Sequence, residues 1–154
     1  MAQSEGLTVA GALTDAKGDR SKPPSQQAEP DTNLHIKEVR KDGIVIRGAK
    51  LMICGTAASQ EIFLLPGSGY KDPDKDYALA CVVPRDIEGL TIVEARHASD
   101  KRELEETSDV EVPDTGITQG WLLFDDVFVR VPGQRLLSVR FPLPWLSERR
   151  ADGG

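Results

Sequence analysis

The stretch LHIKEVRKDGIVIR, residues 34–47, decides the fold class of this chain. Its two halves, Leu34–Val39 and Ile44–Arg47, are rich in apolar and β-branched residues, which suit the pleated surface of a sheet. Lys41–Gly43 separates them, and its Asp-Gly pair tolerates the positive φ angles of a tight hairpin turn. The stretch therefore predicts two antiparallel strands joined by a short turn.

Short runs of the same character recur on both sides of this hairpin, separated by turn-rich segments such as PGSG and KDPDKD. No apolar repeat at helical spacing extends over the length of a helix. The small polar run Gly55–Gln60 predicts a bend or a single helical turn. Regular short strands with polar connections favour a mostly β barrel or sandwich. The further strands are expected at Leu7–Leu13, Ala49–Cys54, Glu61–Leu65, Tyr77–Val83, Leu90–Glu94 and Gly120–Phe124.

Residues 1–130 are expected to form one domain, since a chain of 154 residues can enclose a single hydrophobic core. Two segments inside it, 15–32 and 98–116, consist mainly of charged residues, Pro, Ser and Gln, so we expect them to pack poorly. Residues 131–154 carry clustered Arg and Pro without a period of 2 or 3.6. We expect this part to be a divergent, disordered tail.

The charge and apolar patterns exclude two classes of partner. With 19 Lys and Arg against 25 Asp and Glu, the formal charge is −6, which does not match the basic surface of a nucleic-acid-binding protein. No apolar run approaches the roughly 20 residues that span a bilayer. Met1–Gly6 also lacks the basic and apolar regions of a signal peptide. We therefore expect a cytoplasmic protein that binds neither nucleic acid nor membrane.

The residues that most often hold metals or perform catalysis form no telling pattern. Cys54 and Cys81 each lie in an apolar run without a second Cys or His at metal spacing, so we expect two buried free thiols. His35 and His97 have no Ser, Cys or carboxylate at a spacing that would indicate a triad. The sequence therefore predicts no metal site and no catalytic residue.

Two segments are candidates for a binding site. In LTDAKGDRSK, residues 13–22, Thr14 and Gly18 can offer a hydroxyl and backbone donors to a flat ring, while Arg20 and Lys22 can meet phosphates. In ICGTAAS, residues 53–59, small side chains would let a cofactor approach the backbone. The first segment also fits a solvated charged loop, and the second also fits a tight turn without a ligand.

Together these segments resemble a known arrangement. Thr14-Asp15, the Asp42-Gly43 turn, IRGAKLMI at 46–53 and FDDVFV at 124–129 follow the order of motifs in the middle domain of the acyl-CoA dehydrogenase fold. Three longer stretches resemble the 4-hydroxyphenylacetate 3-hydroxylase and 4-hydroxybutyryl-CoA dehydratase family: TDAKGDRSKPPSQQ at 14–27, RGAKLMICGTAASQEIFLLPG at 47–67 and ACVVPRDIEGLTIVEAR at 80–96. The resemblance covers about residues 7–129, and KGDR at 17–20 is more similar to the dehydratase branch.

The resemblance implies a flavin-binding middle β-barrel that contacts FAD through both segments, with Thr56 near the isoalloxazine ring and the substrate. It also implies an acyl-CoA or phenolic substrate and a homotetrameric enzyme. The implied cofactor-binding residues are Thr14, Asp15, Lys17, Gly18, Arg20, Ser21, Gly55, Thr56, Ala57 and Ala58.

The resemblance further implies that family members carry helical domains on both sides of this domain, which are missing here. In the dehydratase branch three Cys and one His of those domains hold an iron–sulfur cluster, and Cys54 and Cys81 match none of them. We therefore expect a fragment that binds FAD weakly and is inactive alone. Three interpretations stay open: a dehydratase-type fragment, an aromatic hydroxylase domain of the 4-hydroxyphenylacetate 3-monooxygenase type, and a non-catalytic β-barrel remnant.

Overall fold

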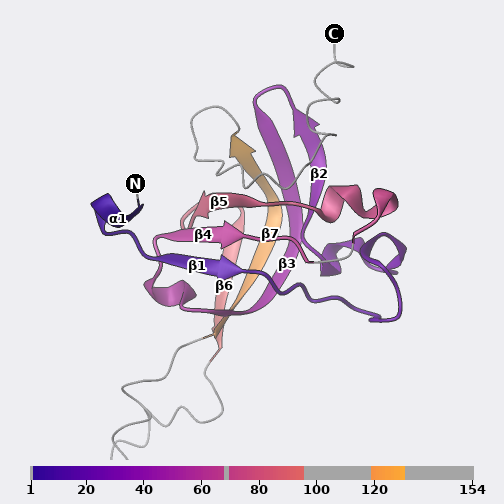
Figure 1. Cartoon of the computed structure of the whole chain (residues 1–154), viewed down its shortest axis with the longest axis horizontal. Helices are drawn as coiled ribbons and strands as arrows, with labels where there is room; N and C mark the ends of the chain where they lie inside the picture. The colour runs from indigo at the N-terminus through magenta and orange to yellow at the C-terminus, as the bar shows by residue number, and fades with distance from the viewer. Residues whose placement is uncertain (1, 68–69, 96–118, 131–154) are drawn as a thin grey trace, which may run out of the picture.

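The computed structural model describes residues 2–67, 70–95 and 119–130, and this part of the chain is mostly β (Figure 1). One short α-helix, α1 (Ala2–Glu5), precedes the first strand. The strands are β1 (Val9–Ala12), β2 (His35–Arg40), β3 (Gly43–Cys54), β4 (Glu61–Leu64), β5 (Cys81–Pro84), β6 (Leu90–Ala95) and β7 (Gln119–Arg130). Four short 3₁₀ helices lie between them: η1 (Pro24–Gln26), η2 (Pro30–Thr32), η3 (Thr56–Ala58) and η4 (Asp72–Tyr77). None of the helices in the described ranges is long and apolar enough to cross a membrane.

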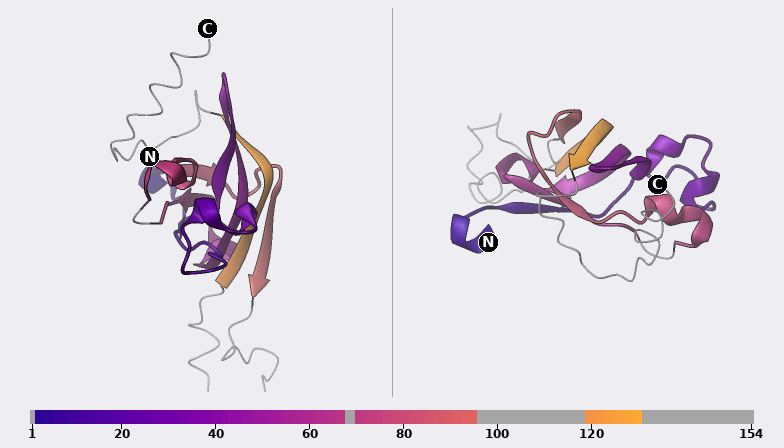
Figure 2. Two further views of the ribbon diagram at one scale, coloured as in Figure 1. Left: turned by 90° about the vertical axis from the view of Figure 1, so that its right-hand side faces the viewer. Right: turned by 90° about the horizontal axis from the view of Figure 1, so that it is seen from above.

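The strands form two sheets that lie against each other as layers (Figure 2). One sheet has the order β1-β4-β5, in which β1 and β4 run parallel and β4 and β5 antiparallel. The other has the order β2-β3-β7-β6 and is antiparallel throughout. The prediction of a mostly β fold is confirmed, and the two sheets are open rather than closed into one barrel.

The predicted hairpin is present as β2 and β3, with Arg40 paired to Gly43 and Val39 to Ile44. The sequence suggested a break at Gly48, but β3 continues through it because β7 pairs along both halves of the strand. Gly48 has φ 126°, a conformation that side chains rarely adopt, and it lies at a register shift between the two strands. The long β3 therefore reaches from the hairpin to the second candidate segment.

The core lies between the sheets and consists of aliphatic side chains from both of them. Strand β7 shows the expected alternation, because Leu122 and Phe124 are buried whereas Trp121 and Leu123 are exposed. Each fully buried aliphatic side chain contributes about 1.5–3 kcal/mol relative to exposure. The fully buried aliphatic residues are Ile46, Ile62, Leu64, Val83, Leu122, Val127 and Val129.

The prediction for the cysteines is confirmed for Cys81, which is buried, and is wrong for Cys54, which is exposed. Alternation along β3 puts Lys50 inside, and an uninterrupted strand would also put Cys54 inside. The pairing with β7 shifts between Lys50 and Ile53, where Met52 adopts φ 56°. This irregularity inverts the alternation, so Ile53 faces the core and Cys54 faces outward.

Other connections also differ from the sequence-based expectation. The predicted strand Tyr77–Val83 begins only at Cys81, because Tyr77 belongs to η4. In the polar segment 15–32 only Asp15 is buried, yet backbone hydrogen bonds and the turns η1 and η2 give it a defined path. The segment 98–116 and the tail 131–154 lie outside the described residues.

Candidate functional site

The connection between β1 and β2 is a loop whose two ends are joined to each other (Figure 1). The amide of Ala16 donates to the carbonyl of Thr32 at 3.0 Å. The amide of Leu34 donates to the carboxylate of Asp15 at 3.2 Å. Residues 17–31 therefore leave the sheet and return to it at one place, as in other compact surface loops.

A buried ion pair fixes this loop to β3. Lys50 Nζ lies 2.8 Å from Asp15 Oδ1, and both side chains are only 3% exposed. The same ammonium donates to the carbonyls of Leu13 and Leu65, at 3.0 and 2.9 Å. Burial lowers the pKa of Lys50, and the Asp15 carboxylate opposes this change. Because three acceptors surround the ammonium, the pair is tolerated away from water.

Within the loop, the side chain of Gln27 holds the turn that carries the predicted cationic residues. Its Oε1 accepts a hydrogen bond from the Asp19 amide at 2.9 Å. Its Nε2 donates to the carbonyls of Asp19 and Lys22, at 2.8 and 3.1 Å. The Asp19 carboxylate accepts hydrogen bonds from the Ser21 hydroxyl and amide, which lower its pKa. Local polar groups thus satisfy the backbone of this turn.

The turn also needs left-handed backbone. Lys17 and Gly18 have φ angles of 65° and 52°. A side chain at Gly18 would place its Cβ 2.6 Å from Gln27 Oε1. The left-handed conformation therefore favours glycine at this position, and a larger residue would displace the Gln27 side chain from its hydrogen bonds.

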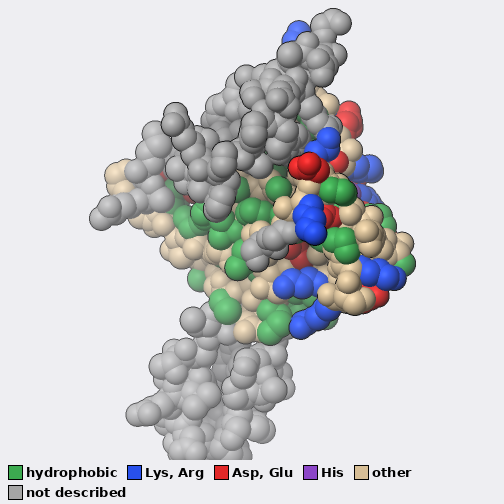
Figure 3. Space-filling model, turned by 45° about the vertical axis from the view of Figure 1, so that its right-hand side comes forward, with side chains coloured by type: hydrophobic (Ala, Val, Ile, Leu, Met, Phe, Trp, Pro, Cys, Tyr) green, Lys and Arg blue, Asp and Glu red, His purple; other side chains and the backbone are tan. Residues whose placement is uncertain are grey.

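A cleft of about 430 Å³ opens beside this loop. It brings together three of the predicted cofactor-binding residues, Asp15, Lys17 and Arg20, whereas Thr14, Gly18 and Ser21 belong to the same loop without lining the cleft. Figure 3 views the molecule from near this side and shows Lys and Arg side chains gathered beside apolar ones. The other lining residues are Lys22, Pro23, Pro24, Gln27, Asn33, Gly67, Tyr70 and Asp74.

Two cations of this cleft are available for a ligand. Lys22 lies 3.4 Å from Asp19 and so has an acidic neighbour within the loop. Lys17 and Arg20 form no ion pair with any residue of the described ranges. The side chains therefore present positive charge to the cleft, and an anion would complement it.

The second candidate segment forms the predicted single turn at the end of β3. Gly55 adopts a left-handed φ of 74° and starts η3. A second, shallower hollow of about 510 Å³ lies beside this turn and includes the predicted residues Ala57 and Ala58. Ser59, Gln60, Arg85, Asp86 and Ile92 complete its lining.

Thr56 lies on the inner side of this turn and is fully buried. Its hydroxyl donates to Glu94 Oε1 at 2.8 Å, which joins the turn to β6. Gly120 of β7 passes so close that a Cβ there would collide with the Thr56 hydroxyl. The hydroxyl is thus used within the fold, while the predicted proximity of Thr56 to a flavin stays a prediction.

The two candidate segments contact different parts of β3. Lys50 anchors the first segment and Gly55 begins the second, and a fully extended chain between them would span at most roughly 16 Å. The cleft and the hollow have no lining residue in common. A single ligand that touches both segments must therefore be elongated.

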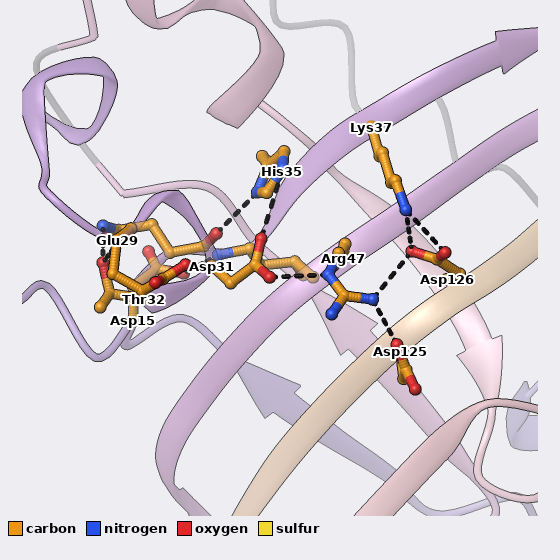
Figure 4. Close-up of polar contacts among 11 residues, drawn as sticks. Asp15, Glu29, Asp31, Thr32, His35, Lys37, Arg47, Asp125 and Asp126 are labelled. Carbon is orange, nitrogen blue, oxygen red and sulfur yellow. Dashed lines mark hydrogen bonds and ion pairs between the residues drawn. The ribbon is translucent and has the colours of Figure 1, made fainter.

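On the outer face of β3, Arg47 joins the far end of the loop to β7 (Figure 4). Its guanidinium forms ion pairs with Asp31 of η2, at 2.6 Å, and with Asp125 and Asp126. These carboxylates raise the pKa of Arg47, Asp31 first. Lys37 extends the group by binding Asp126 at 2.6 Å, which lowers the pKa of Asp126. Both ends of the loop are thus fixed to β3, at Lys50 and at Arg47.

Sequence reasoning missed the residues that shape the cleft from a distance. Gln27 is separated from Asp19 by eight positions and has no periodic signal. Tyr70 reaches the cleft from the connection between β4 and η4, and burial raises its pKa. In the described residues no group of three His, Cys, Asp or Glu side chains gathers as metal ligands do.

The fold is that of known flavoenzyme structures. The oxygen-tolerant archaeal 4-hydroxybutyryl-CoA dehydratase from N. maritimus superposes with a TM-score of 0.76 and 35% identity, over 84% of this chain and 26% of that one. The oxygenase component (HpaB) of 4-hydroxyphenylacetate 3-monooxygenase complexed with FAD superposes with a TM-score of 0.65 and 27% identity. This match covers 82% of this chain and 26% of that chain. A glutaryl-coenzyme A dehydrogenase gives 0.52 at 15% identity over 82% of this chain and 27% of that chain, a likeness of fold only.

The sequence comparisons identify the family. A family model described as 4-hydroxyphenylacetate 3-hydroxylase N terminal matches residues 1–137, and the chain belongs to this family. It is 40% identical over 136 residues to 4-hydroxybutyryl-CoA dehydratase/vinylacetyl-CoA-Delta-isomerase of Clostridium aminobutyricum, covering 87% of this chain and 27% of that protein. The oxygenase component of 4-hydroxyphenylacetate 3-monooxygenase of Geobacillus sp. is 29% identical over 94 residues, which cover 60% of this chain and 19% of that protein. The chain thus spans about a quarter or less of the length of these relatives.

Proposed function

We propose that this chain forms the FAD-binding β-domain of a flavoenzyme that resembles 4-hydroxybutyryl-CoA dehydratase. The observation that carries the proposal is the cationic cleft. Lys17 and Arg20 have no ionic partner among the described residues, and they line a cleft in a loop fixed at both ends to β3. Structures of relatives with this fold contain FAD or FADH2.

The residues present are compatible with an elongated flavin dinucleotide. Lys17 and Arg20 would neutralise phosphate oxygens in the cleft. The small residues Ala57 and Ala58 would let a flat ring approach the backbone near the end of β3. When bound, FAD would supply the redox chemistry. The domain itself would bind and orient the cofactor.

Within the family, the dehydratase branch is the first candidate. Identity to the Clostridium aminobutyricum dehydratase is 40% over 136 residues, against 29% over 94 residues for the Geobacillus sp. monooxygenase component. The proposed substrate of the whole enzyme is therefore an acyl-CoA, and the proposed assembly is a homotetramer. A phenol hydroxylase of the 4-hydroxyphenylacetate type is the second candidate, since the relatives include its FAD-bound structure.

A chimera tests the proposal. The matching segment of the Clostridium aminobutyricum dehydratase is replaced by residues 7–130 of this chain, and the FAD that copurifies with the protein is measured by absorbance. We expect stoichiometric FAD in the chimera. The double variant Lys17→Ala/Arg20→Ala should lose most of it, because both phosphate-binding cations are removed.

Lys41→Ala serves as the matched control, since Lys41 is an exposed cation in the β2–β3 turn, outside the cleft. It should leave the FAD content of the chimera unchanged. A folded chimera without FAD would contradict the proposed function. Equal FAD in the double variant and the control would contradict the role of Lys17 and Arg20.

A further inference from the structure

The outer face of the β2-β3-β7-β6 sheet carries a group of exposed apolar side chains. Trp121 and Leu123 lie on this face of β7, and Val93 of β6 is paired with Trp121. Met52 lies on β3 at the register shift with β7. The four side chains are 41–62% exposed. Cross-strand neighbours on one face are about 5 Å apart, so these residues form one surface, the outer patch.

The outer patch has the size of a docking surface for one segment of chain. A stable dimer interface takes about 20–30 residues from each partner. The patch offers four large apolar side chains within the described part of the chain. An extended segment presents every second side chain to the same side, so a few residues cover a strip of this kind. Adjacent exposed apolar side chains often mark an interaction site.

The chain itself contains a segment with a matching pattern. Over its whole length the tail 131–154 has no period, but in residues 137–145, the alternating segment, every odd position is apolar. These positions are Leu137, Val139, Phe141, Leu143 and Trp145, and the even ones are Ser138, Arg140, Pro142 and Pro144. Such alternation gives an extended chain one apolar side, and the two prolines disfavour a helix.

The alternating segment follows β7 closely enough to reach the outer patch. Strand β7 ends at Arg130, and Pro132-Gly133 is a turn signal that can reverse the chain. Residues 142–144 then come level with residues 121–123, because both stretches lie about ten residues from this turn. Strand β7 is already paired on both edges, with β3 and β6, and its inner face holds the core. The returning chain can therefore pass only over the outer face.

The charges beside the outer patch favour the same path. Beyond Leu123 the outer face of β7 continues to Asp125, whose side chain is 80% exposed. The ion pairs around Arg47 join two cations to three carboxylates, so one negative charge is left over. Arg140 of the alternating segment comes level with Asp125 by the same count from the turn. Its guanidinium would compensate the excess charge at this end of the patch.

We propose that the alternating segment lies extended across the outer patch of its own chain, with Phe141, Leu143 and Trp145 facing the sheet. The tail is then ordered in part, because the sheet supplies the apolar surface that the segment lacks by itself. Most of the segment lies beyond residue 137, where the family match ends, so the contact is a property of this chain. It is independent of the proposed function, since the patch and the cationic cleft share no residue.

Fluorescence of Trp121 in the full-length chain tests whether the patch is covered. The chain has two Trp, so Trp145→Phe leaves Trp121 alone and keeps an aromatic ring in the segment. In this background, acrylamide quenching is compared for Leu143→Ser and its matched control, Leu146→Ser, which lies at an even position. Leu143→Ser should raise the fraction of chains with an open patch about tenfold and increase the quenching, because a buried leucine is lost. Leu146→Ser should leave the quenching unchanged.

A cross-link shows which chain supplies the segment. Cys54 faces outward on β3 and is paired with Gln119, two residues before Trp121, whereas Cys81 is buried. Leu146→Cys adds a thiol at the end of the alternating segment, and a short bismaleimide joins it to Cys54 where the two lie close. We expect a product of monomer mass whose yield does not change on dilution. Leu143→Ser should reduce this yield.

Two results would overturn the inference. Equal quenching of Trp121 in the Leu143→Ser and Leu146→Ser variants would show that the alternating segment does not cover the patch, which would leave this face to a separate polypeptide. A cross-linked product of twice the monomer mass, whose yield falls on dilution, would show that a second copy occupies the patch. The FAD content of the chimera bears on neither result, because the chimera contains only residues 7–130 of this chain.

Discussion

The ammonium of Lys50 and the carboxylate of Asp15 lie 2.8 Å apart in the interior of the domain, where each side chain is 3% exposed. The pair joins the middle of β3 to the start of the loop that carries the cationic cleft. Each of these buried charges is compensated by the other, so removing one leaves the other uncompensated away from water. The position of the start of the loop therefore depends on this pair.

Lys50→Met should destabilise the domain strongly. The substitution keeps the side-chain length but leaves the Asp15 carboxylate and two carbonyl groups without their donor. Removing one partner of a buried pair reduces the free energy of unfolding by about 3–5 kcal/mol. Urea unfolding followed by circular dichroism measures the loss.

Lys37→Met is the matched control for this change. Lys37 also pairs with a carboxylate, that of Asp126, but both side chains are about half exposed. Water replaces the lost partner there, so the effect should be small. Equal losses for the two lysine variants would show that burial does not govern the Lys50 pair.

Gly48→Ala should destabilise the domain, whereas Gly11→Ala should be tolerated. Gly48 has φ 126°, and a Cβ there would meet the carbonyl oxygen of Asn33 and lie 2.8 Å from the Cα of Leu34. We expect a loss of at least about 2 kcal/mol in the free energy of unfolding. A Cβ at Gly11 meets no atom within 4 Å, so its change should stay within about 0.5 kcal/mol. Thermal unfolding compares the two variants.

The two cysteines should react at very different rates. Cys54 is exposed, and Cys81 is buried with its pKa raised by burial to about 12. A thiol reagent at pH 8 should modify one thiol rapidly in the native protein and both after denaturation. Cys54→Ser should abolish the rapid reaction, and two rapid thiols in native protein would contradict the burial of Cys81.

The raised pKa of Cys81 also predicts the direction of a pH effect. The thiol ionises near pH 9 in the unfolded chain but only near pH 12 in the folded one, so the folded state binds more protons between these values. The free energy of unfolding should therefore fall as the pH rises from about 9 towards 12. The free energy of unfolding should fall less with pH in Cys81→Ala. Urea unfolding of both proteins at pH 8 and 10.5 measures the difference.

Asp126→Asn should make the free energy of unfolding depend less on pH at acidic pH. Hydrogen bonds from Lys37 and Arg47 lower the pKa of Asp126, so its contribution is present above the unfolded pKa and is lost as the pH falls through the lower folded value. Asp126 has φ 53°, which Asn also adopts readily, so the substitution removes the charge without straining the backbone. Urea unfolding between pH 3 and 7 measures this effect. The free energies of unfolding of the variant and of the unsubstituted protein should differ near pH 7 and converge as the pH falls.

This chain should bind FAD weakly without a partner domain, and fluorescence quenching measures the affinity. Its two candidate segments lie in separate shallow depressions, so the cofactor would stay largely exposed. Exposed cofactor surface forfeits about 25 cal/mol per Å² of apolar burial, while the entropic cost of immobilising it remains. Arg20→Ala should then change little in this chain but reduce FAD in the chimera. Submicromolar affinity would show that this domain forms the site unaided.

Local features were predictable from the sequence. The β2–β3 hairpin follows from an Asp-Gly turn between apolar runs, and η3 follows from a small polar segment after a strand. The cationic loop was also recognisable, because its charges are adjacent in the chain. Each of these depends on residues close in sequence.

Features that depend on distant residues were not predictable. The Asp15–Lys50 pair unites the start of the loop with the middle of β3, and no composition or period indicates it. The exposure of Cys54 follows from an irregularity at Met52, which the pairing partner on β7 determines. The sequence of β3 alone does not show that β7 pairs with it or where the register of this pairing shifts.

The joined ends of the loop affect how the sequence of this domain can evolve. Because Ala16 bonds to Thr32, and Asp15 and Asp31 hold the two ends of the loop to β3, we expect that residues 17–30 can be lengthened, shortened or replaced without altering the register of either sheet. Residues inserted there would lie at the surface of the domain. If the loop binds the ligand as proposed, its residues can change in evolution separately from the strands beneath it, which carry most of the hydrophobic core.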